Sequence, residues 1–172
     1  MNAALACRDP VLVIEHVDLY QSMGRIPDGD LDYVIPLGKA LVRREGRLAT
    51  VLTYLSMVPK CLAVIERLGL DVELIDLRSL DRASLDWQTV GASIEKTNSV
   101  LIVEQGARGT SYGGWLADEV QRRYFDWLDQ PVERLMGGEA SPSVSKVLER
   151  AAIAGEEEIE AALLRALAAQ GG

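Results

Sequence analysis

The chain has 172 residues, of which 48% are hydrophobic and 26% are charged, and its formal net charge is −8 at pH 7. This length suits one domain of ordinary size with a short additional segment, and this composition excludes an intrinsically disordered chain. The negative charge argues against a protein that binds nucleic-acid phosphates, which needs clustered Lys and Arg, and it favours a basic protein partner.

Membrane insertion and secretion are not expected either. No apolar run approaches the roughly 20 residues that span a bilayer. Residues 1–10 lack the basic start and apolar stretch of a secretory signal. The two cysteines, Cys7 and Cys61, belong to no disulfide or zinc-binding pattern. We therefore expect no membrane partner and a reducing, cytoplasmic location.

The first predicted element is a buried strand over residues 11–17, where β-branched apolar residues form a continuous run. Residues 18–33 are irregular and rich in Asp and Gly, which is typical of a linker. We place a domain boundary there. Residues 1–32 then form one unit, and residues 33–172 form the main domain.

Two further strands are predicted over residues 39–44 and 48–54. The Glu45-Gly46 turn between them is very short, and a connection of that length can only join antiparallel strands. We therefore expect these two strands to pair with each other and to add an antiparallel component to the sheet.

From residue 57 onward, helical and extended patterns alternate. The helix over 57–68 has apolar residues at spacings of three and four, Ser56 as a candidate N-cap, and Gly69 as its end. Such alternation indicates right-handed crossovers and a mainly parallel sheet covered on both faces. The predicted fold is therefore α/β, with a mixed sheet of about five strands. The later strands are expected at 71–77, 99–104 and 131–136, and the later helices at 85–96, 114–128 and 156–168.

The glycine-rich segment 106–114 follows a predicted strand and precedes a helix, where ligands often bind in open α/β sheets. It matches neither GxGxxG nor GxxxxGK[ST]. We favour a connecting loop or part of a subunit interface over an anion site or a catalytic loop. The candidate interface or loop-pinning residues of this segment are Gly106, Arg108, Gly109, Gly113 and Gly114.

Charged residues at strand ends are further candidates. Glu104 ends an apolar strand, and we favour a role as acceptor for loop N–H groups over acid–base chemistry. Asp76 and Arg78 either bind a ligand carboxylate or form an ion pair that pins their loop. For His16, a packed or partly exposed histidine is favoured, because no triad partner is nearby and GxSxG is absent.

Aromatic residues cluster around the helix predicted at 114–128. Core packing explains some of them, but they cannot all share one helix face, so an interface is a reasonable alternative. The residues concerned are Tyr112, Trp115, Tyr124, Phe125 and Trp127.

Several motifs, in their order along the chain, resemble one family. They are YVIPLGKA (33–40), RREG (43–46), TVLTYLSMV (50–58), DVELIDLRSL (71–80) and VLIVEQG (100–106). Together they resemble the C-terminal domain of the beta subunit of thiamine-diphosphate-dependent 2-oxoacid dehydrogenases, a group that covers the pyruvate, branched-chain and acetoin enzymes. The segment PVLVIEHVDLY (10–20) resembles the last strand of the preceding pyrimidine-binding domain.

The resemblance implies a transketolase C-terminal fold, with three α/β/α layers and a five-stranded mixed sheet. It implies an alpha-two beta-two heterotetramer that binds thiamine diphosphate and Mg between the alpha subunit and the N-terminal domain of the beta subunit. Since that domain supplies the activating glutamate, we expect no catalytic, cofactor-binding or metal-binding residue in this chain, and no activity from it alone. The implied partners are the alpha subunit, a second beta subunit, and the basic subunit-binding domain of dihydrolipoyl acyltransferase.

One departure leaves the substrate class open. In the segment 137–148, Glu139 stands where the family usually has Asp, and the family's tyrosine is absent. The alternatives are the C-terminal domain of a sister enzyme, such as transketolase or deoxyxylulose-phosphate synthase, and a stand-alone domain that binds a small anion through 106–114. We also expect the isolated chain to self-associate, because a surface that normally meets a sister subunit should remain apolar.

Overall fold

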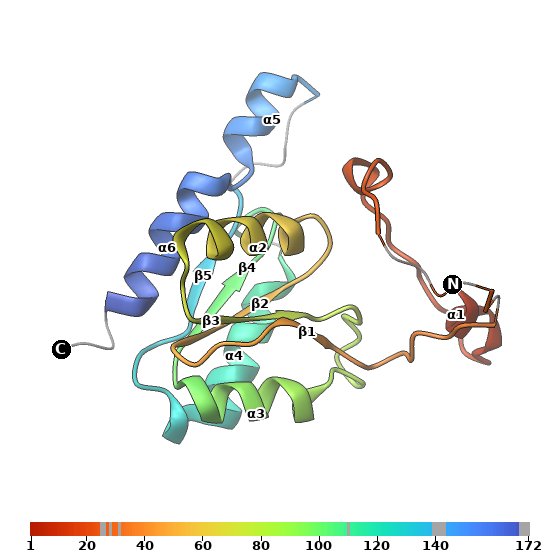
Figure 1. Ribbon diagram of the computed structural model, residues 1–172, viewed down its shortest axis with the longest axis horizontal. Helices are drawn as coiled ribbons and strands as arrows, with labels where there is room; N and C mark the ends of the chain where they lie inside the picture. Colours follow the sequence, from red (N-terminus) through yellow and green to blue (C-terminus); the bar gives the residue numbers. More distant parts are fainter. Residues whose placement is uncertain (25–26, 28, 31, 110, 139–143, 169–172) are drawn as a thin grey trace.

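A computed structural model describes residues 1–24, 27, 29–30, 32–109, 111–138 and 144–168, with the side chains of 150 and 151 left aside. Within these residues the chain forms a five-stranded sheet of order β1-β3-β2-β4-β5 (Figure 1). All neighbouring strands are parallel except β1 and β3. The strands are β1 (Leu41–Arg44), β2 (Ala49–Thr53), β3 (Val72–Asp76), β4 (Val100–Val103) and β5 (Glu133–Leu135).

Helices cover both faces of this sheet, so the predicted three-layer α/β/α fold is confirmed. On one face, α2 (Met57–Leu68) and α6 (Glu156–Ala168) pack against inward residues of the central strands. On the other face lie α3 (Trp87–Thr97) and α4 (Tyr112–Tyr124), with a second apolar cluster beneath them (Figure 1). The central strands β2 and β4 are buried along their whole length, as expected for parallel strands covered on both sides.

The predicted pairing of the first two strands of the domain is wrong. β1 pairs antiparallel with β3, and β2 lies on the far side of β3. The link between β1 and β2 crosses the start of β3, where the amides of Arg47 and Leu48 both donate to the carbonyl of Asp71, at 3.1 and 2.9 Å. A short link can therefore join two strands that a third strand separates.

The strand predicted over residues 11–17 is also wrong. These residues, all of them described, form no strand, and the described part of the chain before β1 contains only α1 (Asn2–Ala6) and the short 3₁₀ helix η1 (Val17–Leu19). Leu12, Ile14 and Val17 are exposed. Because a strand needs a neighbour to satisfy its backbone groups, an apolar run without one stays extended and unpaired. The red segment in Figure 1 accordingly lies beside the sheet and adds no strand to it.

Helix ends were predicted with mixed success. Gly69 ends α2 in the left-handed conformation, with φ of 63°, as expected. Ser56 is the N-cap residue of α2, as expected, but its hydroxyl makes no capping hydrogen bond among the described residues. The helix expected over 114–128 ends at Tyr124 and continues as the 3₁₀ helix η2 (Phe125–Trp127), and α5 (Lys146–Ala152) was not predicted. Glu139 lies outside the described residues.

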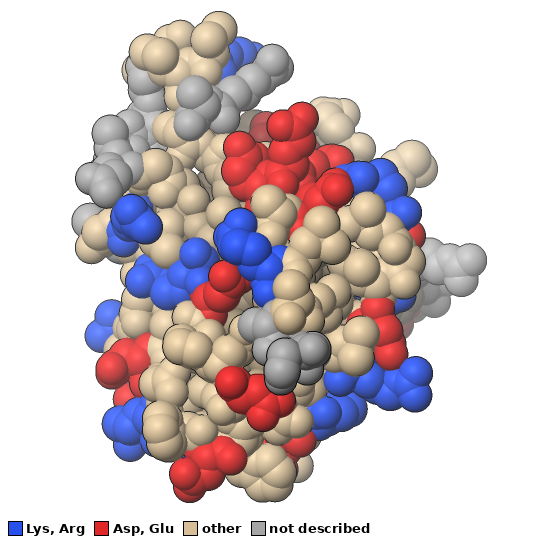
Figure 2. Space-filling view, turned by 90° about the vertical axis from the view of Figure 1, so that its left-hand side faces the viewer, with Lys and Arg blue, Asp and Glu red and all other residues tan. Residues whose placement is uncertain are grey.

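No helix in the described part of the chain combines the length and the apolar character needed to cross a membrane. On the face drawn in Figure 2, acidic and basic side chains are interspersed. Two ion pairs join α6 to neighbouring elements, Glu160 with Arg67 of α2 at 2.9 Å and Arg165 with Glu133 of β5 at 3.4 Å.

Candidate functional site

Glu104 is the central residue at the edge of the sheet where the parallel strands end. It directly follows β4 and its side chain is fully buried. Its carboxylate accepts hydrogen bonds from the Gly113 amide at 2.8 Å and the Tyr54 hydroxyl at 3.0 Å, and Arg134 lies 3.4 Å away. A buried carboxylate is tolerated when it is paired and hydrogen-bonded in this way. Glu104 thus accepts a loop N–H group and anchors the start of α4.

The glycines of the 106–114 segment make this arrangement possible. A Cβ atom at Gly113 would meet the Glu104 carboxylate at 2.2 Å, and one at Gly106 would meet the Ser111 side chain at 2.9 Å. Gly114 and Gly109 are less constrained, since a Cβ atom at Gly114 would meet nothing closer than 3.5 Å and one at Gly109 nothing within 4 Å. Close packing therefore explains Gly106 and Gly113 without a bound ligand.

Asp76 and Arg78 lie at the end of β3, on the same edge of the sheet. The backbone amide of Arg78 donates to the Asp76 carboxylate at 3.2 Å, and Arg78 has a φ of 56°. Burial raises the pKa of the Asp76 carboxyl above its usual value, although Arg78 and Arg43 oppose this shift. The two residues are thus linked through the main chain, and the Arg78 side chain is exposed.

A contact that the sequence does not reveal joins the N-terminal segment to this edge. His16 Nε2 lies 2.8 Å from the Gln105 amide oxygen, which also accepts a hydrogen bond from the buried Ser56 hydroxyl at 2.7 Å. The Asp18 amide donates to His16 Nδ1 at 3.3 Å, so Nε2 carries the proton and donates to Gln105. His16 is half-buried and holds the segment in place.

Arg134 and Tyr112 are also at this edge; Arg134 was not singled out in the sequence, and Tyr112 was named only as one of the clustered aromatic residues. Arg134 donates to the Ser111 hydroxyl at 3.0 Å as well as approaching Glu104, yet its buried Nε has no hydrogen-bond partner among the described residues. The same holds for the Tyr112 hydroxyl, and burial raises its pKa to about 12. Both residues depend on contacts between distant parts of the chain, so a local sequence pattern cannot reveal them.

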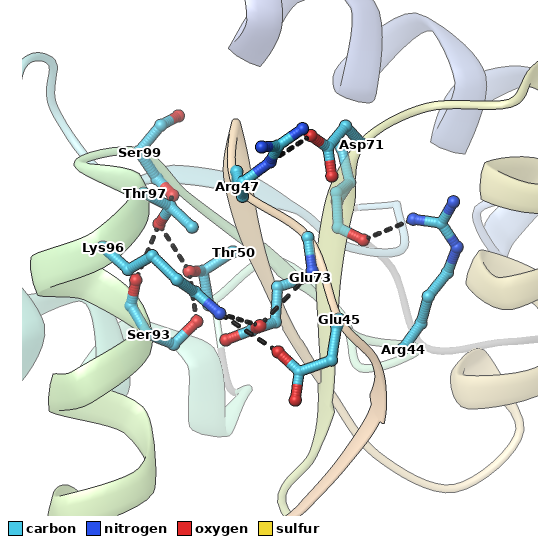
Figure 3. A network of polar contacts seen from close by, with 12 residues as sticks. Arg44, Glu45, Arg47, Thr50, Asp71, Glu73, Ser93, Lys96, Thr97 and Ser99 are labelled. Atoms are coloured by element: carbon cyan, nitrogen blue, oxygen red, sulfur yellow. Dashed lines mark hydrogen bonds and ion pairs between the residues drawn. The ribbon is translucent and has the colours of Figure 1, made fainter.

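The opposite edge of the sheet carries a second polar network (Figure 3). Glu73 of β3 is buried and forms an ion pair with Lys96 of α3, which also reaches Glu45 at 3.2 Å. Burial alone raises the pKa of the Glu73 carboxyl, but hydrogen bonds from Lys96, Ser93 and the Gly46 amide outweigh burial and hold that pKa below its usual value. The network fixes the β1–β2 link to the sheet.

Hydroxyl groups extend this network into the core between β2 and α3. Thr50 lies 2.6 Å from both the Ser93 and the Thr97 hydroxyl, and all three residues are buried (Figure 3). On the outer side, Arg47 pairs with Asp71 at 3.0 Å. Three residues of the RREG motif at 43–46 therefore have a structural role at the crossing: Arg44 donates to the Val72 carbonyl at 2.9 Å, Glu45 contacts Lys96, and the Gly46 amide donates to Glu73.

The aromatic cluster is divided between core and surface. Trp87, Trp115 and Tyr124 pack together, with ring centroids 6.2 and 6.3 Å apart, and the Tyr124 hydroxyl donates to the Trp87 carbonyl at 3.1 Å. Phe125 and Trp127 of η2 are exposed. Packing therefore accounts for the first group, and the second group remains available for an interface.

The described residues of this chain do not provide a ligand set that fits the magnesium diphosphate of a thiamine cofactor. In the described part of the chain, no three His, Cys, Asp or Glu residues are grouped so that they could hold a metal ion. The carboxylate of Glu104 is already engaged by Tyr54, Gly113 and Arg134.

Comparison with known proteins identifies the family. The model of the transketolase C-terminal domain matches residues 38–159, which is more than two thirds of the chain. The chain belongs to the transketolase C-terminal domain family. The resemblance inferred from its motifs is thereby confirmed at the level of the domain.

Curated relatives of this transketolase C-terminal domain are named beta subunits of the pyruvate dehydrogenase E1 component. The chain is 33% identical to that of Rhizobium meliloti (strain 1021) over 162 residues, which are 92% of this chain and 35% of the relative. It is 34% identical to a mitochondrial beta-1 subunit of Arabidopsis thaliana over 171 residues, which are 96% of this chain and 47% of the relative. The chain thus spans less than half the length of these relatives.

A solved structure supports the fold. The split-gene transketolase described as an inactive beta4 tetramer matches with a TM-score of 0.62 and 20% identity, over 83% of this chain and 46% of that one. At this identity the match shows a common fold and nothing about activity.

Proposed function

We propose that this transketolase C-terminal domain is the assembly domain of a thiamine-diphosphate-dependent 2-oxoacid dehydrogenase beta subunit. It supports oxidative decarboxylation of a 2-oxoacid or acetoin through contacts with other subunits, and thiamine diphosphate and Mg bind elsewhere in the complete enzyme. Its partners are the alpha subunit, a second beta subunit, and the subunit-binding domain of dihydrolipoyl acyltransferase. The identity of 33–34% to pyruvate dehydrogenase beta subunits supports this function over that of a sister thiamine enzyme.

The observation that carries the proposal is that the carboxylate at the ligand-binding edge of the sheet is engaged by the chain itself. In an open α/β sheet this edge is where catalytic groups and ligands usually lie. Here Glu104 is buried and accepts hydrogen bonds from Tyr54 and Gly113, so it offers a substrate no free base. A domain of this kind contributes to the enzyme through contacts between its surface and other subunits.

The surface before β1 supports an assembly role. Leu12, Ile14, Val17 and Met23 are exposed in a segment that His16 ties to the sheet edge. Several exposed apolar side chains in one short segment suit a contact surface, because contiguous apolar surface marks interaction sites in soluble proteins. We propose that residues 1–32 are the end of a preceding pyrimidine-binding domain with its linker, and that residues 33–172 are the assembly domain.

Charge supports docking of a basic partner. The net charge of −8 would speed association with a basic subunit-binding domain and make it sensitive to salt. A reducing, cytoplasmic location is proposed on the basis of Cys7 and Cys61, which are both described and both free.

Calorimetry with the purified chain tests the function. We expect saturable, salt-dependent binding to the basic subunit-binding domain of the acyltransferase from the same source. Titration with thiamine diphosphate and Mg should give no tight binding, and the chain alone should not decarboxylate pyruvate. Tight cofactor binding, or catalysis by the chain alone, would contradict the proposal.

A further inference from the structure

The main chain of the segment 8–20 is not bonded to the sheet. Residues 8–15 make no main-chain hydrogen bond within the described structure, and the amides of Leu19 and Tyr20 donate to carbonyls of the same segment, at 3.0 and 3.1 Å. The side chains of Leu12 and Ile14 are exposed, so their burial does not hold the segment either. Its position therefore depends on contacts made by other side chains.

His16 supplies such a contact. Its Nε2 lies 2.8 Å from the Gln105 amide oxygen, in the loop that follows β4. A second side-chain bond of the segment, from the Tyr20 hydroxyl to Glu15 at 2.8 Å, stays inside the segment. Among the hydrogen bonds and ion pairs between described residues, the bond from His16 to Gln105 is the one that joins 8–20 to the rest of the chain.

Both sides of this bond are fixed in advance. The Asp18 amide donates to His16 Nδ1 at 3.3 Å, which leaves the proton on Nε2, where it faces Gln105. The Gln105 oxygen also accepts from the buried Ser56 hydroxyl at 2.7 Å. A donor and an acceptor that are each held by a further hydrogen bond lose little freedom when they meet.

From these observations we propose that His16 is a latch. It holds residues 11–17 in one position at the carboxyl edge of the sheet, and the segment moves independently of the domain when the bond to Gln105 is broken. Because Leu12 and Ile14 stay exposed in the held position, the latch presents them to a partner in a fixed direction. That consequence rests on the proposed function, whereas the latch itself is a contact within the chain.

Nitrogen-15 NMR of the imidazole tests the donor. His16 is the only histidine of the chain, so its ring signals need no assignment among several residues. At pH 8 we expect the tautomer with the proton on Nε2. A proton on Nδ1 would overturn the proposal, because Nε2 would then have nothing to donate to Gln105.

Nitrogen-15 relaxation of the full chain tests the holding role with two substitutions of different reach. His16→Gln keeps an amide N–H donor near the position of Nε2, whereas the side chain of His16→Asn is too short to reach Gln105. We expect backbone order parameters of about 0.85 for residues 12–17 in the parent chain and His16→Gln, and below about 0.6 in His16→Asn. Gln105→Met, which removes the acceptor, should free the segment as His16→Asn does.

Tyr20→Phe is the matched control, because it removes a bond of the same length inside the segment. It should leave these order parameters unchanged. Mobile residues 12–17 in the parent chain, or ordered ones in His16→Asn, would reject the latch. Circular dichroism checks each fold, and His16→Asn decides if Gln105→Met does not fold. These readouts need no partner, so failure of the latch is distinct from failure of the proposed function, which binding to the acyltransferase domain decides.

Discussion

At the scale of single residues, two buried carboxylates of this protein hold distant parts of the chain together. Glu104 anchors the start of α4 at one edge of the sheet, and Glu73 anchors the β1–β2 link at the other. Each carboxylate is satisfied by groups of the same chain, which is the condition for burying it. Removing a partner or crowding a carboxylate should therefore affect stability first.

Gly113 and Gly114 offer a direct test of the packing around Glu104. Gly113→Ala would place a Cβ atom 2.2 Å from the carboxylate, and we expect a loss of about 3 kcal/mol or more in the free energy of unfolding, from overpacking and a disturbed hydrogen bond. Gly114→Ala is the matched control in the same helix, where helix propensity should stabilise by up to about 1 kcal/mol. Urea unfolding measures both. Similar effects of the two substitutions would show that Glu104 does not constrain position 113.

The Glu73–Lys96 pair should make stability depend on pH in the acid range. Because the Glu73 pKa is lowered on folding, its stabilising contribution is complete above the usual value of 4.5 and is lost as pH falls through the lower folded value. Glu73→Gln should therefore cost about 2 kcal/mol at pH 7, through loss of hydrogen bonds to a charged group. The difference in free energy of unfolding between this variant and the parent chain should become smaller below pH 4.5.

Glu45→Gln is the control for this experiment, since Glu45 contacts the same lysine but its side chain is 81% exposed. An exposed pair of this kind contributes about 0.5 kcal/mol or less. Urea unfolding between pH 3 and 7 compares the variants. If Glu73→Gln had the same free energy of unfolding as the parent chain at every pH, Glu73 would not be the stabilising partner of Lys96.

Sequence reasoning succeeded at residues whose role is local. Glu104 was expected to accept loop N–H groups because it directly follows an apolar strand, and the Gly113 amide does donate to it. Arg134, Tyr54 and the contact of His16 with Gln105 could not be foreseen. Their partners lie 30 to 89 residues away in the chain, and only the folded sheet brings them together.

At the scale of elements, the order of helices and strands from β1 to β5 followed from hydrophobic periodicity, but the pairing of β1 did not. A short link normally indicates a hairpin. Here the chain crosses the start of β3 closely enough that a Cβ atom at Gly46 would lie 2.1 Å from the Val72 carbonyl carbon. This close approach is a tertiary contact, so the local pattern of the link could not reveal it.

Gly46→Ala tests the importance of this crossing. The β3 backbone cannot move aside without breaking its pairing with both β1 and β2, so we expect a loss above about 4 kcal/mol or a failure to fold. Gly24→Ala is the control, because nothing lies within 4 Å of its Cβ position and the chain there is exposed. Thermal unfolding followed by circular dichroism compares them. A Gly46→Ala variant as stable as Gly24→Ala would contradict the observed topology.

The apolar run at 11–17 shows a second limit of local sequence patterns, because a strand-like sequence does not form a strand here. Its sequence is typical of a buried strand, but the described chain provides no strand beside it, and its apolar side chains remain exposed. Composition alone reports that such a segment is suited to burial and not which surface buries it. The exposure of this segment bears on how the chain assembles with other chains.

At the scale of the whole molecule, the chain is a transketolase C-terminal domain with a preceding apolar segment, spanning less than half of its curated relatives. Leu12 and Val17 are 91% and 74% exposed, and Phe125 and Trp127 of η2 are exposed as well. Apolar surface of this extent favours association with another chain. The function proposed here depends on such contacts.

Light scattering coupled to size-exclusion chromatography, over a range of concentrations, tests this dependence most directly. The chain should have a mass above its 18.8 kDa monomer, and the double substitution of Leu12→Asp and Ile14→Asp should shift it toward the monomer. Ser22→Asp, which adds charge at an exposed polar position of the same segment, should leave the mass unchanged. A strict monomer at the highest concentration would contradict the account of this chain as an assembly domain.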